Sequence, residues 1–217
     1  MNSGKNITRR EFALGAAAFA AAGCVLSAPE ASDGKGAEGI KVRFLGSGAA
    51  GWDPKWLEGS PHARRPSSVL IDGRVLIDFI PTGFDMLPEG CRPEVLFQTH
   101  SHGDHYSPTA AVKSGVKRVY VQESWASAAR EEIAAAAQRL SLPPPEVVAL
   151  PFAKPVEECG LRFTGVPANH STSRVTDGVL ERTSLYLVEK GSTRLLYATD
   201  TGERYSTRRR PSVFSAW

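Results

Sequence analysis

Residues 99–105 read Thr99-His100-Ser101-His102-Gly103-Asp104-His105, and this stretch decides how the rest of the chain is interpreted. His100 and His102 lie two positions apart, so an extended backbone would point both imidazoles to the same side. Gly103 permits a sharp turn, which would bring Asp104 and His105 toward a second, adjacent position. Imidazole and carboxylate groups are typical zinc ligands, and one site needs three or four of them. We predict that this segment divides its ligands between two metal ions, rather than forming a polar loop that merely contains histidine.

The strands and helices expected around this cluster indicate a layered fold. Glu94–Thr99 predicts a strand that ends at the cluster. Asp72-Gly73 separates two β-branched runs, Ser67–Ile71 and Val75–Ile80, and is typical of a hairpin turn. Ser124–Leu140 has apolar residues at helical spacing and predicts a helix packed on the core. Further strands are expected at Ile40–Leu45 and Arg118–Val121 and, in a second sheet, at Val147–Leu150, Leu161–Val166, Ser184–Val188 and Arg194–Ala198. The pattern predicts an α/β or α+β fold.

The cluster and several other segments resemble a known family, the metallo-β-lactamase-fold hydrolases. H-x-H-x-D-H after an apolar strand is that superfamily's main metal motif, and it stands here at residues 100–105. Residues 44–50 (FLGSGAA), 65–72 (RPSSVLID) and 76–78 (LID) resemble the opening strands of its cyclic-phosphate phosphodiesterase branch. Residues 166–170 (VPANH) resemble the segment with the third histidine, and residues 196–202 (LYATDTG) the strand that ends in a bridging aspartate. The resemblance implies an αββα sandwich.

The resemblance also implies the ligands of two metal ions. The first ion would be held by His100, His102 and His170, the second by Asp104 and His105, with Asp200 between them. We expect one or two zinc ions, with manganese as the alternative. His102 stands where the diiron oxygen-reducing branch has glutamate, which disfavours that branch. We interpret His62, in a polar stretch, as a surface residue rather than a ligand.

The C-terminal part departs from the family pattern. The resemblance implies one more histidine for the second metal, beyond the bridging aspartate, together with further strands and helices. The sequence has no histidine after His170 and ends at Trp217. We therefore expect a sandwich that lacks its last elements and a second metal site that is short of one ligand. A truncated copy and a genuine short variant both remain open.

The function expected from these features is hydrolysis by a metal-activated water. Asp104 and Asp200 would be the catalytic residues that orient the water, and the substrate would be a phosphodiester or cyclic phosphate ester. The alternative is a non-catalytic or decayed exported protein that binds metal or ligand on the same scaffold. We expect a small-molecule ester as the partner and no nucleic acid, because the net charge is only +3 and the leader carries most of it.

The N-terminal region is interpreted as a targeting segment rather than as part of the folded domain. Residues 8–14 (TRREFAL) resemble a twin-arginine export signal, followed by an uncharged stretch rich in alanine. We therefore expect an export signal at residues 1–28, a flexible tether at 29–39 and the hydrolase domain at 40–217. Cleavage before Cys24 would give a lipoprotein, and cleavage after Ala28 a soluble periplasmic protein. Contact with a membrane is expected only through the signal or a lipid on Cys24.

The composition limits the remaining classes. The chain has 217 residues, of which 41% are hydrophobic and 23% charged, enough for one sizeable core. Collagen-like, disordered and polytopic membrane proteins are excluded by this composition. Cys91 and Cys159 are too few for a disulfide framework, and we interpret them as small packed residues.

Overall fold

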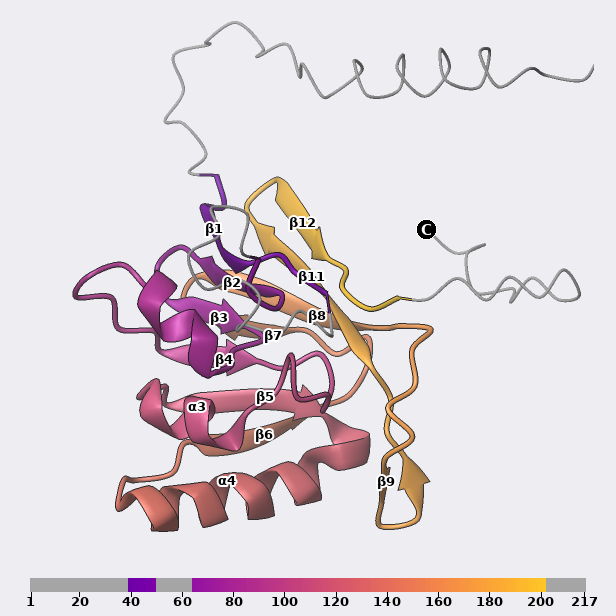
Figure 1. Ribbon diagram of the computed structural model, residues 1–217. Coiled ribbons are helices and arrows are strands. Elements are labelled where there is room, and N and C mark those ends of the chain that lie inside the picture. Colours follow the sequence, from indigo (N-terminus) through magenta and orange to yellow (C-terminus); the bar gives the residue numbers. More distant parts are fainter. Residues whose placement is uncertain (1–38, 50–63, 202–217) are drawn as a thin grey trace, which may run out of the picture. The chain divides into compact units, whose positions relative to one another are not determined.

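The computed structural model describes residues 39–49 and 64–201, which form two main β-sheets, a two-stranded hairpin and a layer of helices (Figure 1). The expected export signal, all but the last residue of the tether and His62 lie outside these residues. Within them, no helix is long and apolar enough to cross a membrane.

The first sheet has six strands in the order β1-β2-β3-β4-β5-β6. These are β1 (Val42–Gly46), β2 (Ser68–Ile71), β3 (Val75–Ile77), β4 (Val95–Phe97), β5 (Arg118–Gln122) and β6 (Glu146–Leu150). The first three pair antiparallel, and β3 to β6 pair parallel. The predicted hairpin is confirmed: Asp72 and Gly73 both have positive φ, 48° and 71°, and they are the central residues of a turn in which the Arg74 N–H donates to the Ile71 carbonyl at 3.0 Å.

Helices cover one face of this sheet. They are η1 (Pro81–Met86), α3 (Pro108–Lys113), η2 (Glu123–Trp125) and α4 (Ala126–Leu140). The apolar stripe predicted for this last helix is buried: Ala129, Ile133 and Ala136 pack with Trp125 against the sheet, and Leu140 is partly buried. The helix starts two residues later than predicted, because residues 123–125 form the 3₁₀ turn η2. Sequence patterning did not find α3, a six-residue helix capped by the Ser107 hydroxyl.

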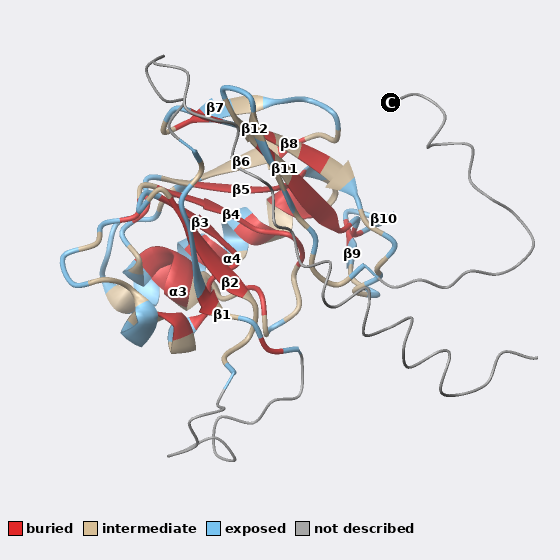
Figure 2. Cartoon of the chain, turned by 90° about the horizontal axis from the view of Figure 1, so that it is seen from above, coloured by how far each residue is buried: buried red, intermediate tan, exposed pale blue. Residues whose placement is uncertain are grey.

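The second sheet lies on the other face and is antiparallel, in the order β12-β11-β8-β7. Its strands are β7 (Val156–Glu158), β8 (Leu161–Pro167), β11 (Ser184–Lys190) and β12 (Thr193–Tyr197), and a short hairpin of β9 (Val175–Thr176) and β10 (Val179–Leu180) precedes β11. Phe97 of the first sheet stacks on Phe163 of the second, with ring centroids 4.1 Å apart. Figure 2 shows buried residues in the inner strands of both sheets and in α3.

One expectation about the sheets is wrong. Residues 147–150 were expected in the second sheet, but β6 is the edge strand of the first sheet and pairs parallel with β5. The helix α4 joins these two strands, and a strand-helix-strand crossover returns the chain to the same sheet as a parallel neighbour. Apolar alternation alone does not distinguish between two sheets, whereas the crossover does.

The topology brings four strand ends together. Asp78 follows β3 directly, and His100 lies three residues after β4. These strands are parallel, so the two side chains are delivered to the same edge of the first sheet. His170 follows β8 and Asp200 follows β12, both from the second sheet.

Candidate metal centre

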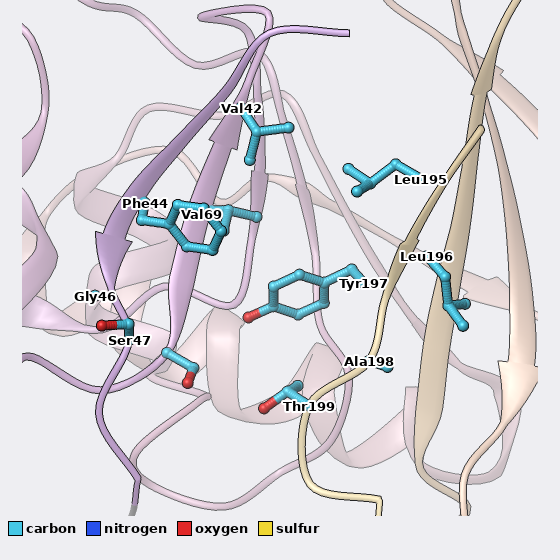
Figure 3. A pocket seen from close by; sticks show the side chains of 11 residues that line it. Val42, Phe44, Gly46, Ser47, Val69, Leu195, Leu196, Tyr197, Ala198 and Thr199 are labelled. Atoms are coloured by element: carbon cyan, nitrogen blue, oxygen red, sulfur yellow. The ribbon is translucent and has the colours of Figure 1, made fainter. Parts of the chain in front are cut away.

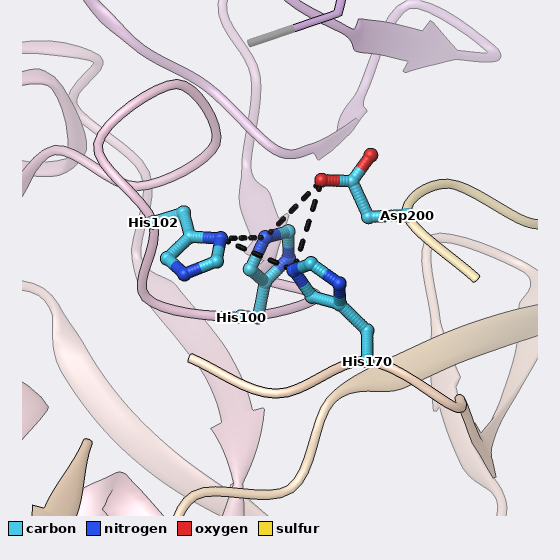
Figure 4. A group of neighbouring side chains, drawn as sticks. All are labelled: His100, His102, His170 and Asp200. Atoms are coloured by element: carbon cyan, nitrogen blue, oxygen red, sulfur yellow. Dashed lines mark hydrogen bonds and ion pairs between the residues drawn. The ribbon is translucent and has the colours of Figure 1, made fainter. Parts of the chain in front are cut away.

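Three imidazoles and one carboxylate converge at this edge (Figure 4). The Nδ1 atom of His102 lies 3.2 Å from Nε2 of His100 and 3.1 Å from Nε2 of His170. The Oδ2 atom of Asp200 lies 3.6 Å from Nε2 of His100 and 3.9 Å from Nε2 of His170. The four residues expected around the first ion are thus brought together.

A second group lies directly beside the first and shares one atom with it. The Nε2 atom of His105 is 3.4 Å from Oδ2 of Asp104 and 3.4 Å from Oδ2 of Asp200. The same Asp200 oxygen therefore faces both groups, which is the position expected for a bridging carboxylate. Among the residues that the structure describes, this second group has three members and the first has four.

The donors fit divalent metal ions. In a tetrahedral zinc site with bonds of 2.0–2.1 Å, neighbouring ligand atoms are about 3.3 Å apart, close to the separations found here. A neutral imidazole carries only one N–H, so Nδ1 of His102 has at most one proton to share between the Nε2 atoms of His100 and His170. In addition, Oδ2 of Asp104 is buried and accepts no hydrogen bond from protein. A cation in each group would satisfy these atoms.

Asp78 orients two of the histidines through hydrogen bonds, and the sequence predicted no role for it. Its carboxylate accepts hydrogen bonds from the backbone N–H of Thr99 (2.8 Å), from the Thr99 hydroxyl (2.8 Å) and from Nδ1 of His105 (2.8 Å). Because the Thr99 hydroxyl donates to Asp78, it is left to accept from Nδ1 of His100, 2.9 Å away. Both Nδ1 atoms therefore carry the proton, and both Nε2 atoms are free for a metal. The only sequence signal was an aspartate at the end of an apolar strand.

Burial sets the protonation of these groups. Burial, together with the neighbouring imidazoles of His105, His102 and His170 when charged, lowers the pKa of His100 to about 2, so this ring is neutral at pH 7. Burial also opposes the charge on His105, but the carboxylates of Asp78, Asp104 and Asp200 together outweigh it and raise the pKa of His105. Burial raises the pKa of Asp78 despite the hydrogen bonds from His105 and Thr99.

The centre is closed on one side and open on the other. The side chains of His100 and His105 are 0% and 1% exposed. Those of His170 and Asp200 are 25% and 28% exposed. The Asp200 side of the cluster is thus partly open to solvent, while the side toward Asp78 is part of the core.

The turn after His102 has a different basis from the one expected. Gly103 does not have a positive φ, and a Cβ atom placed on it would meet nothing within 4 Å. The turn is instead closed by the His102 carbonyl, which accepts from the backbone N–H groups of His105 and Tyr106 at 2.9 and 2.8 Å. Glycine is therefore not required at position 103.

A hollow of about 290 Å³ lies between β1 and β12, next to the centre (Figure 3). Its lining is mainly apolar and includes Val42, Phe44, Leu195 and Tyr197. It reaches Thr199, whose hydroxyl is 3.3 Å from Oδ1 of Asp200. The metal-facing oxygen of Asp200 is the other one, Oδ2, so the hollow borders the centre without containing it.

Comparison with known proteins identifies the family. A family model described as the β-lactamase superfamily domain matches residues 74–210. The chain belongs to this superfamily. It has the metallo-β-lactamase fold, as the sequence resemblance implied. A search of curated proteins finds no match.

Solved structures of the same fold are distant in sequence. Zn²⁺-bound PqqB from Methylobacterium extorquens superposes with a TM-score of 0.51 at 20% identity, over 71% of this chain and 63% of PqqB. The metallo-β-lactamase fold protein YhfI from Bacillus subtilis gives 0.49 at 14% identity, over 72% of this chain and 60% of YhfI. The MIM-2 metallo-β-lactamase gives 0.39 at 19% identity, over 61% and 53%. This superfamily member thus covers less than two thirds of each of these structures.

Proposed function

We propose that this chain is a metal-dependent hydrolase that uses a metal-activated water on a small phosphodiester or cyclic phosphate ester. The observation that carries the proposal is the shared oxygen of Asp200, which faces a group of imidazoles on one side and the Asp104–His105 pair on the other. Two adjacent metal positions joined by a carboxylate are typical of enzymes that hydrolyse phosphate esters.

The proposed ligands fall into two groups, one for each metal ion, and the geometry supports this division. His100, His102 and His170 would hold the first ion, and Asp104 and His105 the second, with Asp200 shared. Bound zinc lowers the pKa of water toward 7 and polarises a phosphoryl oxygen. Zinc is supported by the donor set and by the Zn²⁺-bound state of PqqB, and manganese is the alternative.

Asp104 and Asp200 would orient the attacking water. Asp200 is partly exposed, and both carboxylates face His105. Asp78 keeps the His105 proton on Nδ1, away from the reacting side. The substrate class is supported by the sequence resemblance to the cyclic-phosphate phosphodiesterase branch.

The proposal extends to location. The twin-arginine signal at residues 8–14 would export the protein already folded, which allows metal to be loaded in the cytoplasm before transport. The protein would then act in the periplasm, in soluble form or with a lipid on Cys24.

Hydrolysis of bis(4-nitrophenyl) phosphate by purified, zinc-loaded protein tests the proposal. We expect His100→Ala and Asp104→Asn to lose turnover, and His62→Ala, which changes a histidine outside the proposed ligand set, to retain it. Unchanged rates in His100→Ala and Asp104→Asn would overturn the mechanism. A wild-type protein that binds one ion and hydrolyses no ester would instead favour a metal-binding protein on a hydrolase scaffold.

A further inference from the structure

Glu181 is a buried carboxylate in the segment that joins β10 to β11, and it faces the metal motif. Its Oε1 atom accepts a hydrogen bond from the backbone N–H of Ser101 at 2.8 Å, and its Oε2 atom accepts one from the Ser101 hydroxyl at 2.5 Å. Only 2% of Glu181 is exposed. A carboxylate so far from water needs polar partners to offset its desolvation, and Ser101 supplies two of them.

Ser101 is the residue between two of the proposed ligands. Its position therefore determines how the rings of His100 and His102, whose nitrogens are 3.2 Å apart, stand relative to each other. The Ser101 amide finds its acceptor outside its own loop, in Glu181, 80 positions further along the chain. Without this acceptor, a backbone N–H and a hydroxyl would have to find new partners, and the loop between the two histidines would shift.

The residues after Glu181 hold the third histidine. The Thr183 hydroxyl donates to the carbonyl oxygen of His170 at 3.2 Å. The backbone N–H of Ser184 donates to the carbonyl of Thr99 at 2.9 Å, next to His100. Residues 181–184 are thus hydrogen-bonded both to the loop with the first two histidines and to the residue that supplies the third.

We propose that Glu181 is a positioning residue for the first metal site. Its carboxylate is hydrogen-bonded to Ser101 and acts through that residue, by fixing the separation of the His100 and His102 imidazoles. Through their hydrogen bonds, Glu181 and the three residues after it fix the positions of all three imidazoles relative to one another. This inference rests on the proposed function, because it requires the three histidines to bind a metal ion.

Metal binding by full-length variants tests the inference, with Zn²⁺ and Co²⁺ as probes. Glu181→Ala removes both acceptors, and we expect the dissociation constant of the first ion to rise about 10–100-fold. The visible spectrum of bound Co²⁺ should change as well, because it reports the arrangement of the ligands. In Glu181→Gln, the amide oxygen can accept from the Ser101 N–H and the amide nitrogen can donate to the Ser101 hydroxyl. This variant should recover most of the affinity and the wild-type spectrum.

A matched control separates positioning from general stability. Glu158 is also buried, at 6% exposure, but its carboxylate accepts hydrogen bonds from Arg118 and Tyr120. We expect Glu158→Ala to lower the melting temperature and to leave the Co²⁺ spectrum unchanged. Ser101→Ala removes one of the two donors and should weaken binding less than Glu181→Ala, which keeps the test usable if the latter fails to fold.

Two results overturn the inference. One is a folded Glu181→Ala protein, or Ser101→Ala in its place, that binds Co²⁺ with wild-type affinity and spectrum. The other is an equal spectral change in Glu158→Ala. Failure of the proposed function looks different: the wild-type protein would bind Co²⁺ and hydrolyse no ester, while the comparison of the variants would still decide the role of Glu181.

Discussion

The Nδ1 atom of His105 lies 2.8 Å from Oδ2 of Asp78, and both side chains are buried. The same carboxylate accepts two hydrogen bonds from Thr99, whose hydroxyl in turn contacts His100. One buried group thus orients a proposed ligand of each metal position, although it belongs to neither group of proposed ligands. Groups of this kind orient ligating imidazoles and raise their basicity.

Asp78→Asn should weaken metal binding without removing a ligand. An amide offers a single acceptor oxygen to the three donors of Thr99 and His105, and it loses the negative charge that favours the His105 Nδ1 proton. We expect the affinity of the second ion to fall about 10–100-fold, measured by competition with a chromophoric chelator. Asp85→Asn is the control, because the Asp85 side chain is 82% exposed. Wild-type affinity for both ions in Asp78→Asn would contradict this role.

The two metal positions should differ in affinity. The first has three imidazoles and a carboxylate, whereas the second has His105, Asp104 and a share of Asp200 among the described residues. Titration with a chelator should therefore remove metal in two separated steps, the second ion first, or find only one ion to remove. If both ions left together and only at high chelator concentration, a further ligand would have to complete the second position. His62 would be the first candidate within this chain.

Two glycines should respond in opposite ways to substitution by alanine. A Cβ on Gly46 would lie 2.0 Å from the carbonyl oxygen of Pro66, so the backbone would have to move. We expect Gly46→Ala to lower the free energy of unfolding by about 1–3 kcal/mol. Gly103→Ala, in the metal motif, should preserve stability and metal content, because its Cβ meets nothing within 4 Å. Denaturant unfolding and metal analysis check both, and loss of metal in Gly103→Ala would show that the turn does need glycine.

The sequence predicts this centre as far as its ligands are local or belong to a recognised motif. His100 to His105 stand in one segment, and the resemblance to a known family led to His170 and Asp200. The roles of Glu181 and Asp78 were not found, because each acts through a contact with a residue distant in the chain; Asp78 stood in a segment that resembles the family, but nothing local indicated what it contacts. Their roles follow from tertiary contacts, which composition and periodicity do not contain.

Prediction of the fold from the sequence is limited in the same way. The hairpin at Asp72-Gly73 and the helix α4 were predicted because their signals are local turn chemistry and helical spacing. The sheet to which β6 belongs was assigned wrongly, since membership depends on the crossover that precedes it. The helix α3 was missed because six residues are too short for a periodic apolar stripe to be recognised.

Replacing Arg9 and Arg10 by lysine should block export. The twin-arginine pair is the feature of the leader that the export pathway recognises. Lysine keeps the charge but removes the guanidinium groups. We expect the Arg9→Lys, Arg10→Lys protein to stay in the cytoplasm, where cell fractionation would find it with metal bound. Lys5→Arg is the control, because it alters a basic residue outside the pair. Undiminished export of the double variant would refute this route.

The stability of the metal-free protein should fall as the pH decreases below 6.5. His100 has a folded-state pKa of about 2, lowered mainly by burial, against an ordinary value of 6.5. Between these values the unfolded chain binds a proton that the folded protein does not, so the free energy of unfolding decreases on acidification by about 1.4 kcal/mol per pH unit. From pH 6.5 to pH 5 this group alone accounts for about 2 kcal/mol.

His105 affects the stability in a different pH range, so its contribution can be separated from that of His100. Its pKa is raised, so its stabilising contribution is fully present below pH 6.5 and is lost only as the pH rises through its folded-state value. Asp78, whose pKa is also raised, opposes the effect of His100 in acid, but it is present in both proteins compared here. Urea unfolding of metal-free wild type and of His100→Asn at pH 5.0 to 6.5 should therefore give a steeper pH dependence for the wild type, by about one proton. Parallel curves would mean that His100 takes up a proton in the folded protein and that burial does not keep it neutral.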